Sequence, residues 1–330
     1  MYVAGNSLED AQSKDTQWLN SLHSNKNIEW HGFNSQLARE QKTTCRPTTV
    51  YLFGPLIDAP PAHPDTVLTS LLYMKHSLSE MGMTYAHLSI DMQLYAVAQQ
   101  IKWWEPARFD DVILRPGAMH IIMSYLGCIG NLMKGSGLDI LVAASFGGLT
   151  GIMNGKAWVR AMRAFRMVSV TLLQQFLQGG VKTFNEISRY LEEARQHPTG
   201  RHWVDNLIKP TLLVHQFLRA EREGNWLFQQ LCLEQMLPYF FSAGHVHYAR
   251  YISWHLLEMR HCLPAAAQAD LITGAHVCRH HEGSWNSVSG DYVNPVVKFY
   301  LKLFVYKIAR QIVIQPYICV HLYSTLITVY

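Results

Sequence analysis

The first clear pattern in the chain is a repeated change of hydrophobic spacing between residues 48 and 138, which predicts three strands and three helices. Residues 49–57 (TVYLFGPLI) are rich in β-branched and aromatic side chains, as is typical of a strand. Residues 66–81 carry hydrophobic side chains at helical spacing, and Gly82 then favours a helix end. The same order repeats twice, with predicted strands at 85–90 and 112–115 and predicted helices at 92–103 and 118–134.

Strands that are joined by helices favour a parallel sheet with helices packed on its faces. We therefore expect an α/β fold in this region. After residue 138 helical spacing dominates, with predicted helices at 156–178, 184–196, 203–222, 225–238 and 245–262. The expected organisation is a loosely ordered entry segment (1–47), an α/β core (48–138), a mostly helical region (139–290) and an apolar tail (291–330).

Composition narrows the class of protein without deciding a function. Of the 330 residues, 49% are hydrophobic and 16% are charged, which suits a chain that buries a large core. The net charge of +4 permits a nucleic acid or another anionic partner without requiring one. The N-terminal sequence MYVAGNSLEDAQ lacks the features of a secretory signal, and the six cysteines form no CxxC pair. We expect an intracellular protein, nuclear or cytoplasmic, with buried free thiols.

The apolar tail and the missing nucleotide motifs limit the expected partners further. Residues 311–330 carry no charged side chain, but polar residues and a proline interrupt them, so membrane insertion is the least favoured interpretation of the tail. A buried element and a tail of non-native origin are the alternatives. The sequence has no GxGxxG after a strand, no GxxxxGK[ST] loop and no GxSxG elbow. No small-molecule substrate or cofactor is therefore evident.

Asp91 is the first candidate functional residue because it follows directly after the predicted strand 85–90. Nucleases that use two Mg²⁺ ions hold them about 4 Å apart with carboxylates from neighbouring elements. An aspartate before a helix is more commonly an N-cap, and Asp91 has that alternative. Partners for a metal site would be Glu221 and Glu223, although alternating acids and arginines are also typical of a solvated helix face.

A second candidate is a row of cations at helical spacing. These side chains share an arc of about 120° on the predicted helix and are Lys156, Arg160, Arg163 and Arg166. Such a face could follow a phosphate backbone, and an ordinary solvated face is the alternative. Several histidines also invite a zinc interpretation, but their spacing matches no usual ligand pair; they lie in the segments GHVHYAR and CRHHEG.

Several strings together resemble a known family. They are GPLIDAPPAHPDT, HLSIDMQLYAVA, RPGAMHIIMSYLGCIG, NGKAWVRAMRAFR, RAEREGNW, MLPYFFSAGHVHYARY and AHVCRHHEGSWN. The chain is similar, over about residues 28–290, to uncharacterised open reading frames of invertebrates and fish, which resemble a domain of unknown function that also occurs in fungi and is associated with mobile elements. The resemblance implies a degenerate ribonuclease-H-like core of the transposase type, with a mixed sheet and flanking helices.

The resemblance also implies roles for the acids. Asp91 would match the second acid of such a core, and Glu221 or Glu223 the third. The chain departs from the pattern because no strand before residue 48 ends in an aspartate, so the first acid is missing and the front looks truncated.

We therefore expect a transposon-derived, catalytically inactive protein. A surviving Mg²⁺-dependent nuclease or transposase that uses Asp91 is one alternative. A non-catalytic module that binds nucleic acid or protein through the cationic row is the other.

Overall fold

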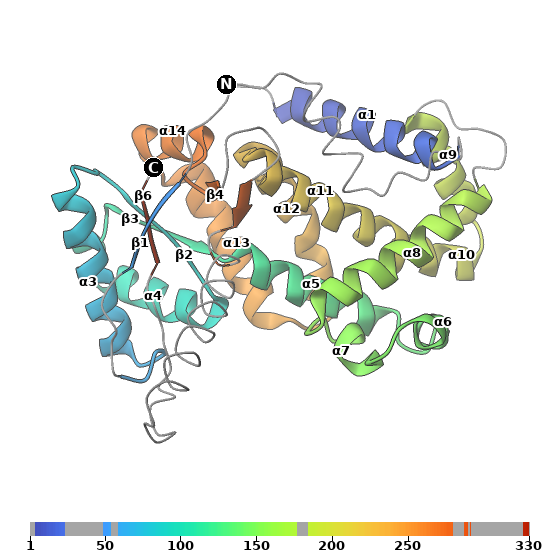
Figure 1. Cartoon of the computed structure of the whole chain (residues 1–330), viewed down its shortest axis with the longest axis horizontal. Helices are drawn as coiled ribbons and strands as arrows, with labels where there is room; N and C mark the ends of the chain where they lie inside the picture. Colours follow the sequence, from blue (N-terminus) through green and yellow to red (C-terminus); the bar gives the residue numbers. More distant parts are fainter. Residues whose placement is uncertain are drawn as a thin grey trace, which may run out of the picture. The chain divides into compact units, whose positions relative to one another are not determined.

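The computed structural model describes residues 4–23, 49–53, 59–176, 184–279, 287–289, 291 and 326–329 (Figure 1). Among these residues helices predominate, and the strands form three separate two-stranded pairs. The chain divides into two compact units. Unit 1 consists of Met1–Cys45, Ile121–Leu256 and Gly283–Trp285. Unit 2 consists of Arg46–His120, Leu257–Glu282 and Asn286–Tyr330.

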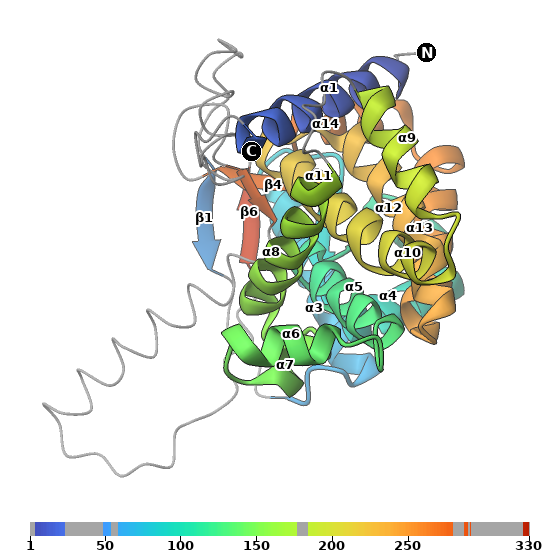
Figure 2. The same cartoon turned by 90° about the vertical axis from the view of Figure 1, so that its right-hand side faces the viewer.

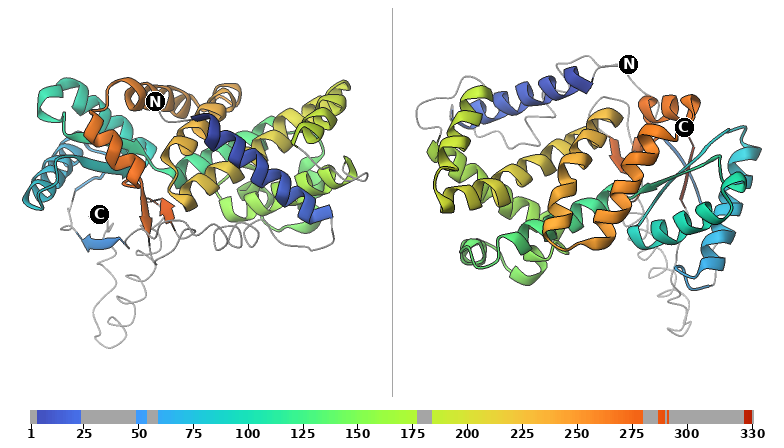
Figure 3. Two further views of the ribbon diagram at one scale, coloured as in Figure 1. Left: turned by 90° about the horizontal axis from the view of Figure 1, so that it is seen from above. Right: turned by 180° about the vertical axis from the view of Figure 1, so that it is seen from behind.

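Unit 2 contains the strand–helix pattern that the sequence predicts. Strands β2 (Ala86–Ile90) and β3 (Val112–Pro116) pair in parallel, and α4 (Met92–Trp104) connects them. Helix α3 (Pro64–Glu80) precedes β2 and packs against both β2 and α4 (Figure 3). The predicted elements at 66–81, 85–90, 92–103 and 112–115 are thus confirmed within one to two residues.

The predicted α/β fold class with its ribonuclease-H-like mixed sheet is wrong, because the described residues are mostly helical. A mixed sheet would join the predicted strands 49–57, 85–90 and 112–115, but the described strands form separate pairs. Instead, β1 (Val50–Phe53) pairs antiparallel with β6 (Leu326–Val329). The third pair joins β4 (Val277–Arg279) to β5 (Ser287–Ser289), also antiparallel. The sequence pattern located β1, β2 and β3 but not β5 or β6. Strand pairing is a long-range property that a local pattern does not specify.

The remaining described elements of unit 2 are short. A single 3-10 turn, η1 (Pro106–Arg108), follows α4, and α14 (Ala265–Thr273) precedes β4. Strand β6 lies inside the tail for which the sequence left a buried element, a membrane span and a non-native tail open. Among the residues that the structure describes, none of the helices is both long and apolar enough to cross a bilayer.

Unit 1 is helical throughout its described parts. Its helices between residues 118 and 203 are α5 (Ala118–Leu132), α6 (Leu138–Ser145), α7 (Leu149–Met153), α8 (Trp158–Phe176), α9 (Phe184–Ala194) and α10 (Pro198–Trp203). The later ones are the π-helix η2 (Val204–Ile208), α11 (Lys209–Glu223), α12 (Trp226–Ser242) and α13 (Val246–His261). The unit boundary falls within α5 and α13. The helices predicted at 156–178, 184–196 and 245–262 agree with α8, α9 and α13 within two residues, and the one predicted at 203–222 covers η2 and all but the last residue of α11. Helix α12 extends four residues beyond its predicted end, and α6, α7 and α10 were not predicted.

The entry segment differs from the expectation of loose order, because residues Ala4–His23 form helix α1. Trp18 and Leu19 of α1 are each only 2% exposed and belong to a hydrophobic cluster of unit 1. The other members of that cluster are Leu173, Ile187, Leu191, Val204 and Ile208. Helix α1 lies beside α9 and α12, as Figure 2 shows. Its buried face includes charged residues, which is why a hydrophobic pattern does not reveal it.

The start of α8 is held by a close backbone approach to α5. A Cβ atom on Gly130 would lie 2.0 Å from the carbonyl oxygen of Met153, and one on Gly155 would lie 2.0 Å from that of Met123. Gly155 also has φ of +75°, which favours glycine. Glycine at these two positions therefore allows the turn between α7 and α8 to rest directly on α5, and that turn fixes where α8 begins.

Candidate functional site

Asp91 acts as the N-cap of α4. Its Oδ1 accepts a hydrogen bond from the backbone N–H of Leu94 at 2.9 Å, and its backbone is extended, as the first residue before a helix usually is. The side chain lies at the carboxyl end of β2. The structure therefore places Asp91 at a strand end, as the sequence predicts, and gives its carboxylate a structural partner.

The two glutamates proposed as its partners lie in unit 1, near the end of α11. Glu221 is only 4% exposed, and its Oε1 accepts a hydrogen bond from the side-chain amide of Gln229 on α12. Glu223 pairs with Lys14 of α1 at 3.2 Å. Both carboxylates thus take part in contacts between helices of unit 1.

A metal site is not formed by the residues that the structure describes, because no three His, Cys, Asp or Glu side chains among them gather in a suitable group. The catalytic roles of Asp91, Glu221 and Glu223 stay predictions, and the mixed sheet from which they were inferred is absent. Asp58, another acid near the predicted sheet, lies outside the described residues.

Three of the four cations in the predicted row share an exposed surface at the beginning of α8. Lys156, Arg160 and Arg163 are exposed, and within the described part of the chain none of them has a carboxylate partner. Lys156 lies in the turn before α8, and the two arginines lie one helical turn apart. We call Lys156, Arg160 and Arg163 the α8 cationic surface.

Arg166 does not share this exposure. It lies at the edge of the 120° arc, toward the buried face of α8, and is half-buried. Its charge acts on His215 of α11, which is 2% exposed: burial lowers the pKa of this imidazole most, and Arg166 and Arg219 lower it further. The prediction that all four cations form one surface therefore needs this correction at Arg166.

The opposite side of α8 explains why the surface cations point outward. Between Trp158 and Phe176 the buried side chains all lie on one side of the helix, and they are Ala161, Ala164, Phe165, Val168, Ser169 and Leu173. The other side presents Arg160 and Arg163, followed by the exposed Met167 and Thr171. An amphipathic helix of this kind fixes its rotation by burying its apolar side, so Arg160 and Arg163 face solvent.

A loop contact orients one of these cations. Arg160 Nη1 donates a hydrogen bond to the carbonyl oxygen of Gly147 at 3.0 Å, in the loop between α6 and α7. Gly148 has φ of +76°, and a Cβ atom there would meet the same guanidinium at 3.0 Å. A carbonyl partner does not neutralise the charge, so Arg160 is positioned but keeps its positive charge available.

The sequence around α8 carries a signal that the row of four cations alone does not reveal. Residues 140–185 contain no Asp or Glu at all, and residues 112–185 contain seven Lys or Arg but only Asp139 as an acid. Since the whole chain has a net charge of only +4, the rest of it is net negative. The positive charge is concentrated in this segment, and a charge count in windows along the sequence would have found it.

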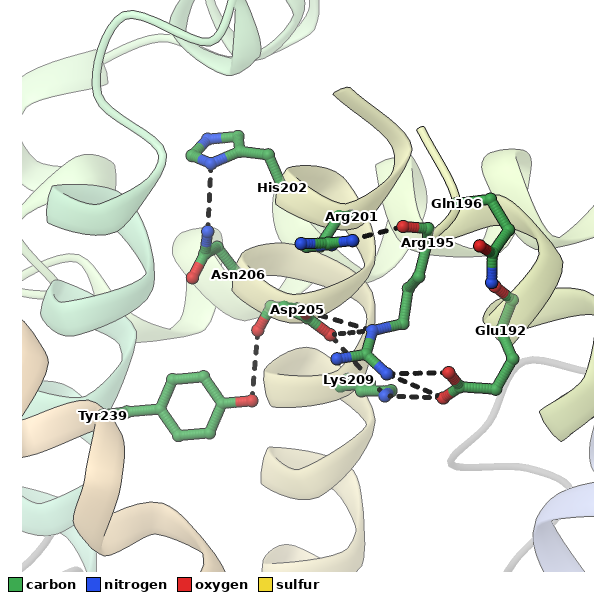
Figure 4. A network of polar contacts seen from close by, with 9 residues as sticks. All are labelled: Glu192, Arg195, Gln196, Arg201, His202, Asp205, Asn206, Lys209 and Tyr239. Atoms are coloured by element: carbon green, nitrogen blue, oxygen red, sulfur yellow. Dashed lines mark hydrogen bonds and ion pairs between the residues drawn. The ribbon is translucent and has the colours of Figure 1, made fainter. Parts of the chain in front are cut away.

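A second group of cations in unit 1 is neutralised. Figure 4 shows a network in which Arg195 pairs with Glu192 at 2.7 Å and with Asp205 at 3.0 Å. Lys209 lies 3.5 Å from each of these two acids. The hydrogen bond to Arg195 lowers the pKa of Glu192, and the same contact raises the pKa of Arg195. Tyr239 OH also donates to the carbonyl oxygen of Asp205 at 3.1 Å.

The histidines with possible zinc spacing have other contacts. His245 Nδ1 lies 2.7 Å from Ser124 Oγ, and partial burial lowers the pKa of this imidazole. His247 stacks on Tyr251 with an interplanar angle of 5°. Cys278 is a buried free thiol, and His280 and His281 lie outside the described residues. Those residues of the zinc hypothesis that the structure describes, His245, His247 and Cys278, therefore do not form a common group.

Unit 2 contains a polar cluster that the sequence did not predict, at the start of α5. Asp291 is 3% exposed and accepts hydrogen bonds from the backbone N–H groups of Met119 and His120, at 3.3 and 3.2 Å. It also contacts His120 Nδ1 at 3.0 Å. A Cβ atom on Gly117 would lie 2.3 Å from this carboxylate. An acid that caps a helix from about 170 positions away leaves no local sequence signal.

The buried imidazole of His87, also in unit 2, has a lowered pKa. His87 Nε2 lies 3.3 Å from Asp270 Oδ2, and the side chain of His87 is 2% exposed. Burial lowers the pKa of His87 to about 4, the nearby charge of Arg115 lowers it too, and Asp270 opposes the shift. Arg115 is itself buried and donates to the carbonyl oxygen of His276 at 3.1 Å.

Comparison with known proteins gives a family and no function. A domain of unknown function, DUF8702, matches residues 29–186 and 174–294, which together span most of the chain. The chain belongs to the DUF8702 family. No curated protein and no solved structure matches it. The DUF8702 match includes the α8 cationic surface, Asp91 and Asp291, and it begins after α1 ends.

Proposed function

We propose that this DUF8702 protein is a non-catalytic nucleic-acid-binding module, and that the α8 cationic surface is its phosphate-binding site. The single observation that carries the proposal is that Lys156, Arg160 and Arg163 are exposed together without a carboxylate partner among the described residues. Phosphate backbones are bound by such groups, and the release of counterions supplies much of the affinity.

The contrast with the paired cations of unit 1 supports this choice. Arg195 and Lys209 are neutralised by Glu192 and Asp205, whereas the segment around α8 contains no acid over residues 140–185. An acid-free cationic segment leaves its charge available to an anionic partner. The resemblance to reading frames of mobile elements agrees with a nucleic-acid partner, and an origin from such an element is part of the proposal.

The test is a binding titration with a labelled DNA duplex at several salt concentrations. We expect the wild-type affinity to fall steeply with salt, and Arg160→Glu with Arg163→Glu to weaken binding by about 10- to 100-fold at ~0.1 M salt. The slope of log K against log salt should become less steep by about 1 for each arginine. An unchanged affinity and slope would remove the proposal.

A matched control changes the same net charge elsewhere on unit 1. Arg189 on α9 and Arg250 on α13 are both exposed. Arg189→Glu with Arg250→Glu should leave the affinity within about twofold of wild type if the α8 cationic surface is the binding site, because only specific phosphate contacts contribute to the salt slope. Equal loss in both double variants would indicate a general charge effect instead.

The non-catalytic part of the proposal has its own test. Supercoiled plasmid incubated with the protein and Mg²⁺ should remain intact, because the carboxylates inferred as metal ligands already cap a helix or join helices. Metal-dependent nicking that disappears in Asp91→Ala would contradict this expectation and favour the nuclease alternative.

A further inference from the structure

Helix α1 lies outside the segment that matches DUF8702, yet it covers one face of unit 1. The match begins at residue 29, and α1 is Ala4–His23. Trp18 and Leu19 are each 2% exposed and pack into the cluster supplied by α8, α9, η2 and α11. The family domain therefore presents an apolar face that a helix from outside the domain fills.

A buried cation lies on the same face. Arg219 of α11 is 0% exposed, and its Nη2 donates to Asp15 Oδ1 of α1. The other oxygen of Asp15 accepts a hydrogen bond from Gln216 Nε2 at 2.6 Å. A buried guanidinium and a neighbouring amide thus hold both oxygens of one carboxylate. Recognition of a carboxylate by two donors is directional and selective.

A second ion pair fixes the direction in which α1 lies. Lys14 is 6% exposed and pairs with Glu223 at the end of α11, at 3.2 Å, and with Asp10 of its own helix at 2.7 Å. Lys14 and Asp15 are adjacent, and their partners lie four residues apart on α11. Because the two pairs have opposite polarity, a helix placed in the reverse direction would bring like charges together.

These contacts define a ligand. We call the described surface of α8, α9, η2, α11 and α12 around Arg219 the α1-binding face. It selects a helix with a lysine, an aspartate, a tryptophan and a leucine in the spacing of Lys14, Asp15, Trp18 and Leu19. We propose that the α1-binding face is a helix-binding site of the DUF8702 domain, which α1 occupies in cis and which also accepts α1 from a second copy of this chain.

The polar contacts of the α1-binding face favour replacement of α1 by the same helix from a second copy over a face that no helix covers. When α1 leaves, the buried Arg219 loses the carboxylate that Asp15 supplies, and removing one partner of a buried ion pair is strongly disfavoured. A second copy restores every contact because it brings the same helix. Exchange of an identical element between copies needs no new complementary surface.

The first experiment uses a fluorescent peptide of residues 4–23 and the full chain. Asp15→Ala with Trp18→Ala in the full chain weakens the resident helix, so we expect the peptide to bind this variant at least tenfold more tightly than it binds the wild type. The peptide with Asp15→Asn should bind the variant at least tenfold more weakly than the wild-type peptide. Equal binding by the two peptides, or no saturable binding to the variant, would overturn the proposal.

A second experiment does not depend on the folding of that variant. A protease site inserted between residues 24 and 48 of the otherwise wild-type chain allows α1 to be cut from the domain after folding. Excess labelled peptide should then replace the cut helix, as measured by size-exclusion chromatography or native mass spectrometry. A cut protein that takes up no labelled peptide would show that α1 is a permanent part of the fold and would overturn the proposal.

The second copy is tested with two wild-type preparations that carry different tags. After incubation together at high concentration they should co-purify, and excess unlabelled peptide of residues 4–23 should prevent it. Absence of co-purification would restrict the site to its own α1 and overturn exchange between copies. If the peptide did not reduce co-purification, the two copies would associate through another surface, and exchange of α1 between copies would also be overturned.

Discussion

Arg163 on α8 and Arg219 on α11 belong to neighbouring helices of unit 1, yet the fold treats their charges in opposite ways. Arg219 is fully buried and pairs with the carboxylate of Asp15. Arg163 is exposed and has no carboxylate partner among the described residues. The difference teaches that pairing in this protein follows burial, because a charge in the interior needs compensation and a solvated one does not.

The ion network of Figure 4 is an intermediate case. Arg195 and Lys209 are partly exposed and are nevertheless neutralised by two acids. Surface pairs of this kind contribute little to stability, so solvation alone does not explain which surface cations are paired. The pairing depends on the local supply of acids, and the segment around α8 contains none between residues 140 and 185.

The largest effect should come from removing the partner of the buried cation. We expect Asp15→Asn to lower the free energy of unfolding by about 3–5 kcal/mol, because it breaks the buried ion pair between Asp15 and Arg219. Urea unfolding followed by circular dichroism measures this. Adding Arg219→Met should recover most of the loss. A single variant as stable as the wild type would break the link between burial and pairing.

The next largest effect should come from the buried imidazole of His87, because burial disfavours its charged form. The folded pKa of His87 is lowered from 6.5 to about 4, chiefly by burial. Its contribution to stability is therefore full above pH 6.5 and is lost as the pH falls through the folded value, by about 3 kcal/mol in total. Unfolding measured from pH 7 to pH 4 should show this loss, and His87→Gln should flatten it. An identical pH profile in the variant would assign the loss to other groups.

The smallest effect should come from the network of Figure 4. Arg195→Gln should lower the melting temperature less than Asp15→Asn does and should leave nucleic-acid affinity unchanged, because the charge of Arg195 is already neutralised. The pKa of Glu192 is lowered by Arg195, so its contribution is present above the ordinary carboxyl pKa and lost as the pH falls through the folded value. If Arg195→Gln weakened nucleic-acid binding as much as Arg160→Glu with Arg163→Glu does, the α8 cationic surface and the network of Figure 4 would not differ in the availability of their charges.

Local elements could be predicted from the sequence because their signals are local. The helix from Pro64 to Glu80, the cap at Asp91 and the parallel pair of β2 and β3 depend on neighbouring residues and short connections. The partner of β1 could not be predicted, because β6 lies more than 270 positions further along the chain. The ribonuclease-H-like sheet was implied by the resemblance to a known family, and it required one mixed sheet where the described strands form separate pairs.

The candidate sites divide in the same way. Helical spacing found Arg160 and Arg163, because exposure on an amphipathic helix follows from the pattern. The same spacing could not detect that Arg166 lies beside the buried His215. Helix α1 was missed because Lys14 and Asp15 look solvent-exposed in a sequence, and their partners lie about 200 positions away.

The π-helical turn at Val204–Ile208 has a consequence for the rotation of everything that follows it. A π turn accommodates one residue more than an α-helical turn does, and each residue of an α-helix advances the side-chain direction by about 100°. If the same residues adopted ordinary α-helical bonding instead, the extra residue would turn α11 by up to about that angle, so that Arg219 would no longer point at Asp15. The extra residue in the π turn therefore sets the rotation of α11 at which Arg219 faces Asp15 of α1.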